Sequence, residues 1–182
     1  MITPKEAADT LATADELYSR VEVEQALDRL AEEISAALSE EDPIVLCVLN
    51  GALIPTGHLL TRLNFPLRQD YVHATRYRGE TSGADLEWIG QPNTSLQGEA
   101  VLVVDDILDE GITLAAIVEA CRKAGARSVY SAVLVEKQHD RSNGYTADFV
   151  GIQVEDRYVF GFGMDYKGYL RNVPGILAIP ET

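Results

Sequence analysis

The residues best suited to chemistry form one short stretch in the middle of the chain. Four apolar residues at 101–104 lead directly into the acidic pair Asp105 and Asp106, and a turn containing Gly111 then leads into a helix. Carboxylates at the carboxyl end of a buried strand can bind sugar hydroxyls or a cation. Successive amides before a helix form a cradle for an anion. The stretch therefore predicts a site for a ligand that combines a ribose with a phosphate.

The elements that must position this stretch alternate between strand and helix patterns. Helical spacing of apolar residues or good end signals predict helices at about 21–38, 55–63 and 113–124. Apolar runs and strand formers predict strands at 44–49, 67–77, 88–89, 100–104, 129–135 and, at a sheet edge, 148–154. This alternation indicates an α/β fold with a mainly parallel, twisted sheet and flanking helices, in a single domain over residues 1–182.

Composition narrows the class of protein. The chain has 182 residues, 46% of them hydrophobic, which is enough for one domain with a full core. Its formal net charge of -14 disfavours binding to nucleic acid or to an anionic membrane, and no run is long enough to span a bilayer. Neither Cys47 nor Cys121 belongs to a CxxC pair, so we expect no disulfide framework and a cytoplasmic protein.

The stretch from Val101 to Leu114 resembles the phosphoribosyl pyrophosphate (PRPP) motif of the phosphoribosyltransferase family. The resemblance implies a type I fold, with Asp105 and Asp106 on the ribose 2′- and 3′-hydroxyls. It also implies that the 5′-phosphate is wrapped by Asp109, Glu110, Gly111, Ile112 and Thr113. Asp109 would approach the purine N7 as general base. Many members carry Thr where this chain has Glu110, so one hydroxyl contact to the phosphate is lost here.

Further segments extend the resemblance from about residue 45 to 179 and are similar to the hypoxanthine-guanine branch of the family. There, Lys137 would donate to the purine O6, Tyr158 would stack on the base and Val159 would bind its edge through the backbone. Asp165 would lie close to the base and to a magnesium ion, and Arg171 would bind pyrophosphate. The resemblance implies Mg²⁺ held at Asp105, Asp106 and Asp165.

Further expectations concern the loops, the chain ends and the assembly. The turn Asn50-Gly51 would bind pyrophosphate through its amides, although relatives often carry Lys or Arg at the first position, and the Leu49–Asn50 peptide bond is a candidate for the cis form. A polar, Gly-bearing loop at about 76–97 would close over the site. The chain ends, with elements at about 155–182, would form a small hood, and the family favours a homodimer or a homotetramer.

The reaction implied by the resemblance transfers the phosphoribosyl group of PRPP to hypoxanthine or guanine, giving IMP or GMP and pyrophosphate. Singly, the same residues have plainer interpretations: Lys137 as a solvated strand end, Tyr158 in the core, Asp165 capping a turn and Arg171 in a surface ion pair. A nucleotide-binding regulator and a xanthine-preferring transferase remain alternatives. A phospho-acceptor domain lacks a suitable Asp at another strand end, and a dinucleotide oxidoreductase lacks a GxGxxG motif after any strand.

Overall fold

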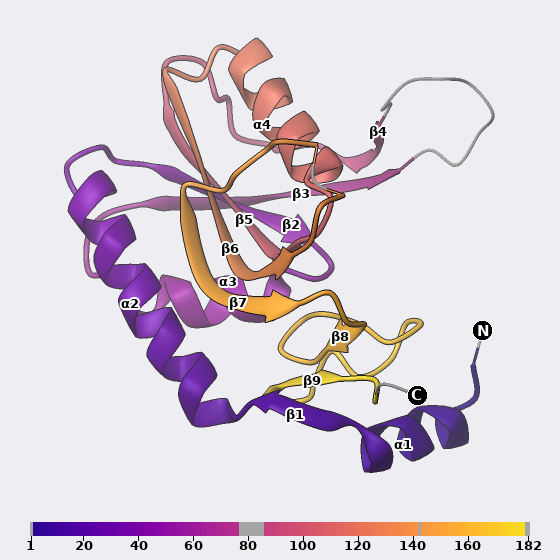
Figure 1. Cartoon of the computed structure of the whole chain (residues 1–182). Helices are drawn as coiled ribbons and strands as arrows, with labels where there is room; N and C mark the ends of the chain where they lie inside the picture. The colour runs from indigo at the N-terminus through magenta and orange to yellow at the C-terminus, as the bar shows by residue number, and fades with distance from the viewer. Residues whose placement is uncertain (1, 77–85, 142, 181–182) are drawn as a thin grey trace.

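The computed structural model describes residues 2–76, 86–141 and 143–180, and within them a central sheet has six strands in the order β4-β3-β2-β5-β6-β7 (Figure 1). Neighbours pair in parallel except β3 and β4, which pair antiparallel, and β7 lies at an edge as predicted. The strands are β2 (Ile44–Leu49), β3 (Arg68–Arg76), β4 (Leu86–Gly90), β5 (Ala100–Leu108), β6 (Ser128–Gln138) and β7 (Phe149–Glu155). The predicted α/β fold with a mainly parallel sheet is confirmed.

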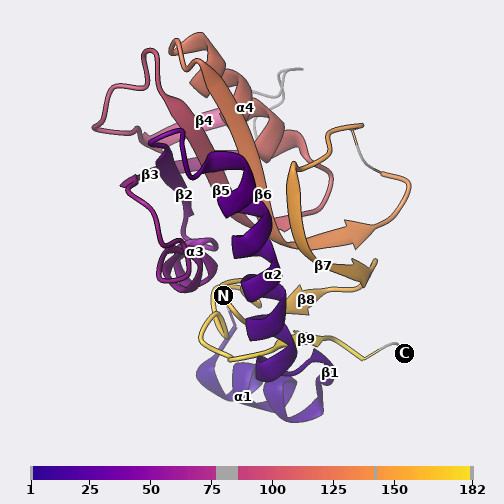
Figure 2. The same ribbon diagram turned by 90° about the vertical axis from the view of Figure 1, so that its left-hand side faces the viewer.

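Helices cover both faces of the sheet (Figure 2). Val45, Leu102 and Leu134 belong to the core cluster that includes α2 (Arg20–Leu38) and α3 (Leu53–Leu60). Val103 and Val133 alternate with them and join the cluster formed with α4 (Ile112–Lys123). Because the inner strands are buried on both faces, they appear in the sequence as continuous apolar runs.

A second, smaller sheet joins the two ends of the chain below the central sheet (Figure 1). Its order is β1-β9-β8, with β1 (Asp15–Tyr18), β8 (Val159–Phe160) and β9 (Ile176–Ala178) all pairing antiparallel. Helix α1 (Pro4–Thr13) precedes β1, with a capping box between Thr3 and Glu6. The expected hood formed from the chain ends is therefore present. Its helix and strands were not predicted individually, although the capping box is visible in the sequence.

Two predicted boundaries were wrong in an informative way. Strand β5 does not end at Val104, because its pairing with β6 continues to Leu108 opposite Glu136. Asp105 and Asp106 consequently lie within the strand. Helix α3 begins two residues before Pro55, which is tolerated in a first turn because its missing N–H needs no partner there.

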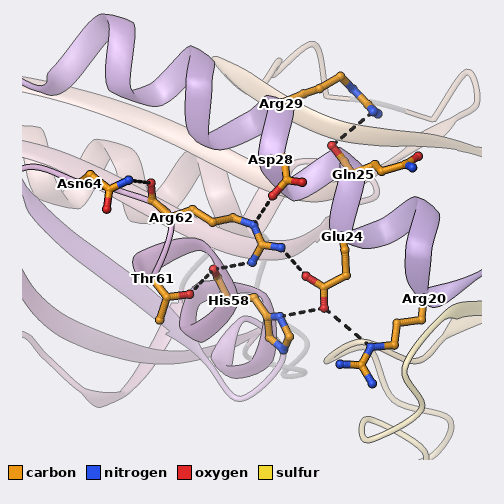
Figure 3. Close-up of polar contacts among 9 residues, drawn as sticks. All are labelled: Arg20, Glu24, Gln25, Asp28, Arg29, His58, Thr61, Arg62 and Asn64. Carbon is orange, nitrogen blue, oxygen red and sulfur yellow. Dashed lines mark hydrogen bonds and ion pairs between the residues drawn. The ribbon is translucent and has the colours of Figure 1, made fainter.

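A polar network joins α2 to α3 (Figure 3). Glu24 pairs with Arg62 and lies 3.3 Å from His58 Nδ1, while Arg62 Nε donates to Asp28 Oδ1 at 2.7 Å. Arg62 Nη1 also donates to the His58 carbonyl at 2.9 Å. The network holds the C-terminal part of α3 against α2. No helix among the described residues combines the length and the apolar character needed to cross a membrane.

Candidate active site

The acidic pair lies near the carboxyl end of β5 and faces the turn that follows β2. The Asp106 N–H donates to Asp105 Oδ1 at 2.9 Å, and the Ile107 N–H donates to Asp106 Oδ1 at 3.0 Å. A Cβ added to Gly51 would lie 1.9 Å from Asp106 Oδ2. The turn therefore approaches the carboxylate so closely that only glycine fits at this position.

Burial dominates the electrostatics of the pair. It raises the pKa of Asp105, which is 8% exposed, well above the usual range, and the negative charge of Asp106 adds to this effect. Burial also raises the pKa of Asp106, although a hydrogen bond with Asp105 and the positive charge of Arg171 oppose the rise. Hydroxyl donors or a cation bound here would stabilise the ionised carboxylates.

The loop that follows the pair leads into α4 through a left-handed residue. Gly111 has φ +82° and is the N-cap of α4 without a side-chain cap. The first N–H groups of a helix lack partners within the helix and suit an anion. The segment after β6 supports this loop, because the Asn143 N–H donates to the Glu110 carbonyl at 3.0 Å. A Cβ on Gly111 would also lie 2.7 Å from Asn143 Oδ1.

A cavity of about 290 Å³ opens between these elements. Most of the predicted sugar-phosphate residues line it, namely Gly51, Asp105, Asp106, Asp109, Glu110, Gly111, Thr113, Asp165 and Arg171. Ile112 and Asn50 do not line this cavity. Asn50 instead lines a neighbouring cavity of about 470 Å³, which shares Arg171 with the first. The Leu49–Asn50 peptide bond is cis, as predicted.

Asp109 lies at the end of β5 between donors that come from β6 and the segment after it. Lys137 Nζ is 3.2 Å from Asp109 Oδ2, and His139 Nε2 is 2.7 Å from Oδ1. The Arg141 guanidinium is 3.7 Å from Oδ1. Partial burial alone would raise the pKa of Asp109, but the hydrogen bond from His139 and the charge and hydrogen bond of Lys137 hold it below its ordinary value. Asp109 is therefore ionised at neutral pH.

A second cavity, of about 240 Å³, continues from the first and shares Asp106, Asp109 and Asp165 with it. Its other predicted lining residues are Lys137, Tyr158 and Val159. Tyr158 is 48% exposed, and its ring meets the Tyr166 ring edge-on at a centroid distance of 5.5 Å. The plainer interpretation of Tyr158 as a core residue is wrong, because its ring lies at the cavity wall.

The hood is attached to the site through Arg171 and Asp165. Arg171 Nη2 is 2.7 Å from Asp165 Oδ1, and Arg171 Nη1 donates to the Gly163 carbonyl at 2.7 Å. A Cβ on Gly163 would lie 2.1 Å from the Gly51 carbonyl, so the hood packs directly on the turn after β2. The plainer interpretation of Arg171 expected an ion pair at the surface. Arg171 does form an ion pair, with Asp165, but both residues line the first cavity.

Most of the sequence that forms this site matches a known protein family. The model of the phosphoribosyl transferase domain matches residues 13–167. The chain belongs to the phosphoribosyltransferase family. It is therefore a phosphoribosyltransferase enzyme, as the resemblance of its acidic motif implied.

Curated relatives in this family match most of the chain. A Bacillus subtilis hypoxanthine-guanine phosphoribosyltransferase is 32% identical over 161 residues, which cover 88% of this chain and 89% of the relative. A Tritrichomonas foetus hypoxanthine-guanine-xanthine phosphoribosyltransferase is 30% identical over 167 residues, 91% of each chain. The human hypoxanthine-guanine phosphoribosyltransferase is 31% identical over 165 residues, which cover 85% of this chain and 76% of the relative.

Solved structures of phosphoribosyltransferases share the fold. A Bacillus anthracis hypoxanthine-guanine phosphoribosyltransferase superposes with a TM-score of 0.83 at 26% identity, over 90% of this chain and 95% of that chain. A hypoxanthine-guanine-xanthine phosphoribosyltransferase gives a TM-score of 0.83 at 28% identity, over 92% and 97%. The type I phosphoribosyltransferase fold expected from the sequence is confirmed.

Sequence reasoning missed two residues of this phosphoribosyltransferase site. His139 and Arg141 follow the end of β6 and lie within reach of Asp109. The signal was the spacing, because residues two apart on an extended strand point to the same side. Lys137 and His139 have this spacing. Part of the expected closing loop at 76–97, residues 77–85, lies outside the described residues.

Proposed function

We propose that this chain transfers the phosphoribosyl group of PRPP to hypoxanthine or guanine, with IMP or GMP and pyrophosphate as products. The observation that carries the proposal is the meeting of Lys137 and Asp109 at a cavity that continues into the one lined by the acidic pair. A base bound in the second cavity would lie beside a ribose bound in the first. The relatives named for hypoxanthine and guanine support the same substrates.

The first cavity suits PRPP. Asp105 and Asp106 would accept hydrogen bonds from the ribose 2′- and 3′-hydroxyls, since buried carboxylates need donors. The segment from Asp109 to Thr113, at the N-terminus of α4, would bind the 5′-phosphate. Backbone amides at Asn50 and Gly51, together with Arg171, would bind the pyrophosphate, and the hood contact of Arg171 keeps it in place.

The second cavity suits a 6-oxopurine. The Lys137 ammonium carries only hydrogen-bond donors, so it matches the O6 acceptor of hypoxanthine or guanine and not the amino group of adenine. Tyr158 is half-exposed at this cavity and would stack on the base, and Val159 beside it would bind the edge of the base through its backbone. Asp165 lies at the boundary of both cavities.

The reaction follows from this placement. A ring nitrogen of the purine forms a bond to the ribose C1′ while the bond from C1′ to the pyrophosphate oxygen breaks. The proton on the purine N7 passes to Asp109, whose lowered pKa keeps it ionised and able to accept the proton. Donors at the pyrophosphate, above all Arg171, stabilise the charge that develops on the leaving group.

A magnesium ion fits this donor set. Among the described residues, no group of three or more His, Cys, Asp or Glu side chains is arranged to hold a metal ion alone. Asp105, Asp106 and Asp165 nevertheless line one cavity, and Mg²⁺ typically takes one or two carboxylates together with substrate phosphate oxygens and waters. Bound there with PRPP, the ion would neutralise charge on the pyrophosphate.

A turnover assay tests the proposal. Purified protein with Mg²⁺ and PRPP is given hypoxanthine, guanine, xanthine or adenine, and pyrophosphate release is measured. We expect rapid release with hypoxanthine or guanine and little with adenine. Dominant release with xanthine would favour the xanthine-preferring transferase, and the name of the Tritrichomonas foetus relative includes xanthine among its bases. Binding of PRPP without release for any base would favour the regulator.

Two further parts of the proposal concern the surroundings of the enzyme. Cys47 and Cys121 are free and buried, which suits a reducing compartment such as the cytoplasm. A homodimer or homotetramer is proposed from the family resemblance, and analytical ultracentrifugation would distinguish either from a monomer.

A further inference from the structure

The side chain of His139, which follows β6, is buried and contacts the Asp109 carboxylate. It is 5% exposed, and both of its ring nitrogens are engaged. Nε2 lies 2.7 Å from Asp109 Oδ1, and Nδ1 accepts a hydrogen bond of 3.0 Å from the Arg141 backbone N–H. A buried imidazole with both nitrogens used has no capacity left for a substrate or a metal ion.

The contact with Arg141 fixes which nitrogen carries the proton. A backbone N–H can only donate, so Nδ1 of His139 must be the acceptor. The proton of the neutral imidazole therefore resides on Nε2 and is donated to Asp109 Oδ1. The backbone of the segment after β6 thus sets the tautomer of His139, and His139 in turn holds one oxygen of Asp109.

We propose that His139 is a positioning residue that orients the Asp109 carboxylate, so that Oδ2 faces the purine N7 during transfer. This inference rests on the proposed function and assigns a role to a residue that the function alone does not require. His139 does not touch the substrate and keeps its own proton throughout.

Lys137 cannot perform the same task during the reaction. It contacts Asp109 Oδ2 at 3.2 Å and lies 4.0 Å from Asp156 Oδ1. When its ammonium binds the purine O6, Oδ2 becomes free to accept the N7 proton. His139 keeps its hydrogen bond to Oδ1 at that moment and prevents the carboxylate from rotating. His139 therefore orients the carboxylate through Oδ1, while Lys137 leaves Oδ2 when it binds the purine.

The charges around Asp109 come from several elements, and each bears on its protonation. Lys137 in β6 and the Arg141 guanidinium, 3.7 Å from Oδ1, are the cations nearby. Asp106 in β5 and Asp165 in the hood line the same cavity, and Asp156 after β7 pairs with Arg141. Because the Arg141 guanidinium is 55% exposed and shared with Asp156, its effect on Asp109 is screened. His139 provides a short hydrogen bond from a buried donor.

The test compares two substitutions at this position. His139→Leu removes the donor, whereas His139→Gln keeps an N–H of similar reach. His139→Asn, whose amide is too short to reach Oδ1, replaces the Leu variant if that variant does not fold. His58→Leu is the matched control, because His58 pairs with Glu24 between α2 and α3, outside both cavities. For each variant, kcat and the KM for hypoxanthine and PRPP are measured, and kcat/KM is followed against pH.

We expect His139→Leu to lower kcat by roughly 10- to 100-fold, the range for loss of a charge-assisted hydrogen bond, with the KM for PRPP little changed. The acid limb of the pH profile should move to higher pH, because the pKa of Asp109 rises when its donor is lost and the base must be ionised to act. His139→Gln should restore much of kcat and return the limb toward that of the wild type. His58→Leu should show neither effect.

The outcomes separate the inference from the function on which it rests. Active wild type, with an unchanged acid limb and unchanged kcat in a folded His139→Leu or His139→Asn variant, would overturn the positioning role alone. Equal losses in the Gln and Leu variants, without movement of the limb, would also overturn it, because they indicate a purely structural role. Wild type that releases no pyrophosphate with any base would overturn the proposed function and this inference together.

Discussion

Two sets of carboxylates at the end of one strand experience opposite environments. Asp105 and Asp106 are neighbours in β5, and burial raises the pKa of both. Asp109, a few residues further along, is partly buried as well, but His139 and Lys137 donate to it and lower its pKa. The same residue type, at the end of the same strand, therefore has its pKa shifted in opposite directions.

The difference comes from the neighbours and not from the carboxylates. At Asp106 the positive charge of Arg171 only partly offsets the effect of burial, whereas Asp109 accepts hydrogen bonds from the Lys137 ammonium and from the His139 imidazole after β6. A pair with raised pKa values gains most from ligands that bring donors or positive charge, such as ribose hydroxyls and a cation. A single ionised carboxylate beside a base-sized cavity is suited to accept a proton.

The largest effect is expected from Asp109→Asn, which removes the ionised carboxylate at Asp109 and leaves Asp105 and Asp106 unchanged. The amide cannot accept a full proton, so kcat should fall by ~10²–10⁴-fold, the usual worth of a general base. The acidic pair and the N-terminus of α4 are unchanged, so the affinity for PRPP should change little. Steady-state kinetics and direct titration of PRPP measure the two quantities.

Asp9→Asn is the matched control for this prediction. Asp9 lies on the exposed side of α1, away from both cavities, and its substitution should leave kcat unaltered. If kcat is retained in Asp109→Asn, the role of proton acceptor must be withdrawn from Asp109. The contrast between the two carboxylate environments would then lack functional meaning.

An intermediate effect is expected from Gly51→Ala, which disturbs the acidic pair and the turn proposed to bind pyrophosphate but lies outside the base cavity. The new Cβ would lie 1.9 Å from Asp106 Oδ2, so the buried carboxylate must shift. Overpacking of this kind typically costs about 1–3 kcal/mol. We expect the KM for PRPP to rise by roughly 10-fold or more, with the preference for 6-oxopurines over adenine retained, because Lys137 and Asp109 keep their contacts.

Gly57→Ala provides the control for the added methyl group. A Cβ at Gly57 meets no atom within 4 Å, and the residue lies inside α3, where alanine is the better helix former. This variant should keep full activity and unfold at the same or a slightly higher temperature. An unchanged KM for PRPP in Gly51→Ala would show that the close contact with Asp106 does not matter for binding.

The smallest effect is expected from Arg141→Gln. The guanidinium is exposed and 3.7 Å from Asp109, so its removal should change kcat by less than about 3-fold. The backbone N–H that holds His139 Nδ1 remains in the variant. A loss as large as that expected for His139→Leu would mean that the exposed cation, and not the buried imidazole, controls Asp109.

The sequence predicted those strands and site residues that a short, continuous pattern of residues determines. The apolar run at 44–49 and the alternation at 148–154 predicted a buried strand and an edge strand, because the number of covered faces decides which residues are apolar. The acidic motif placed Asp105, Asp106 and Asp109 at one edge of the sheet. Their shared cavity follows from that placement.

Other features depend on contacts between distant segments and carry no local signal. Strand β5 continues through the acidic pair because β6 pairs with it up to Leu108. The polar residues of the pair interrupt the apolar run, so the sequence pattern does not show this continuation. Short strands β8 and β9 form only because they pair with each other and with β1. His139 lies two residues after Lys137, but this spacing does not show that the fold brings its imidazole to Asp109.

A comparison of two bases shows whether Lys137, near the end of β6, selects a 6-oxopurine. The ratio of kcat/KM for hypoxanthine to that for adenine is measured in wild type and in Lys137→Met, with Lys123→Met as control, because the Lys123 side chain at the end of α4 is exposed. A site built around one hydrogen bond can reject the mismatched base by ~10⁴-fold or more. We expect such a ratio in wild type and in Lys123→Met, and its collapse in Lys137→Met through loss of hypoxanthine use. Comparable use of adenine by the wild type, or unchanged hypoxanthine use by Lys137→Met, would contradict the account.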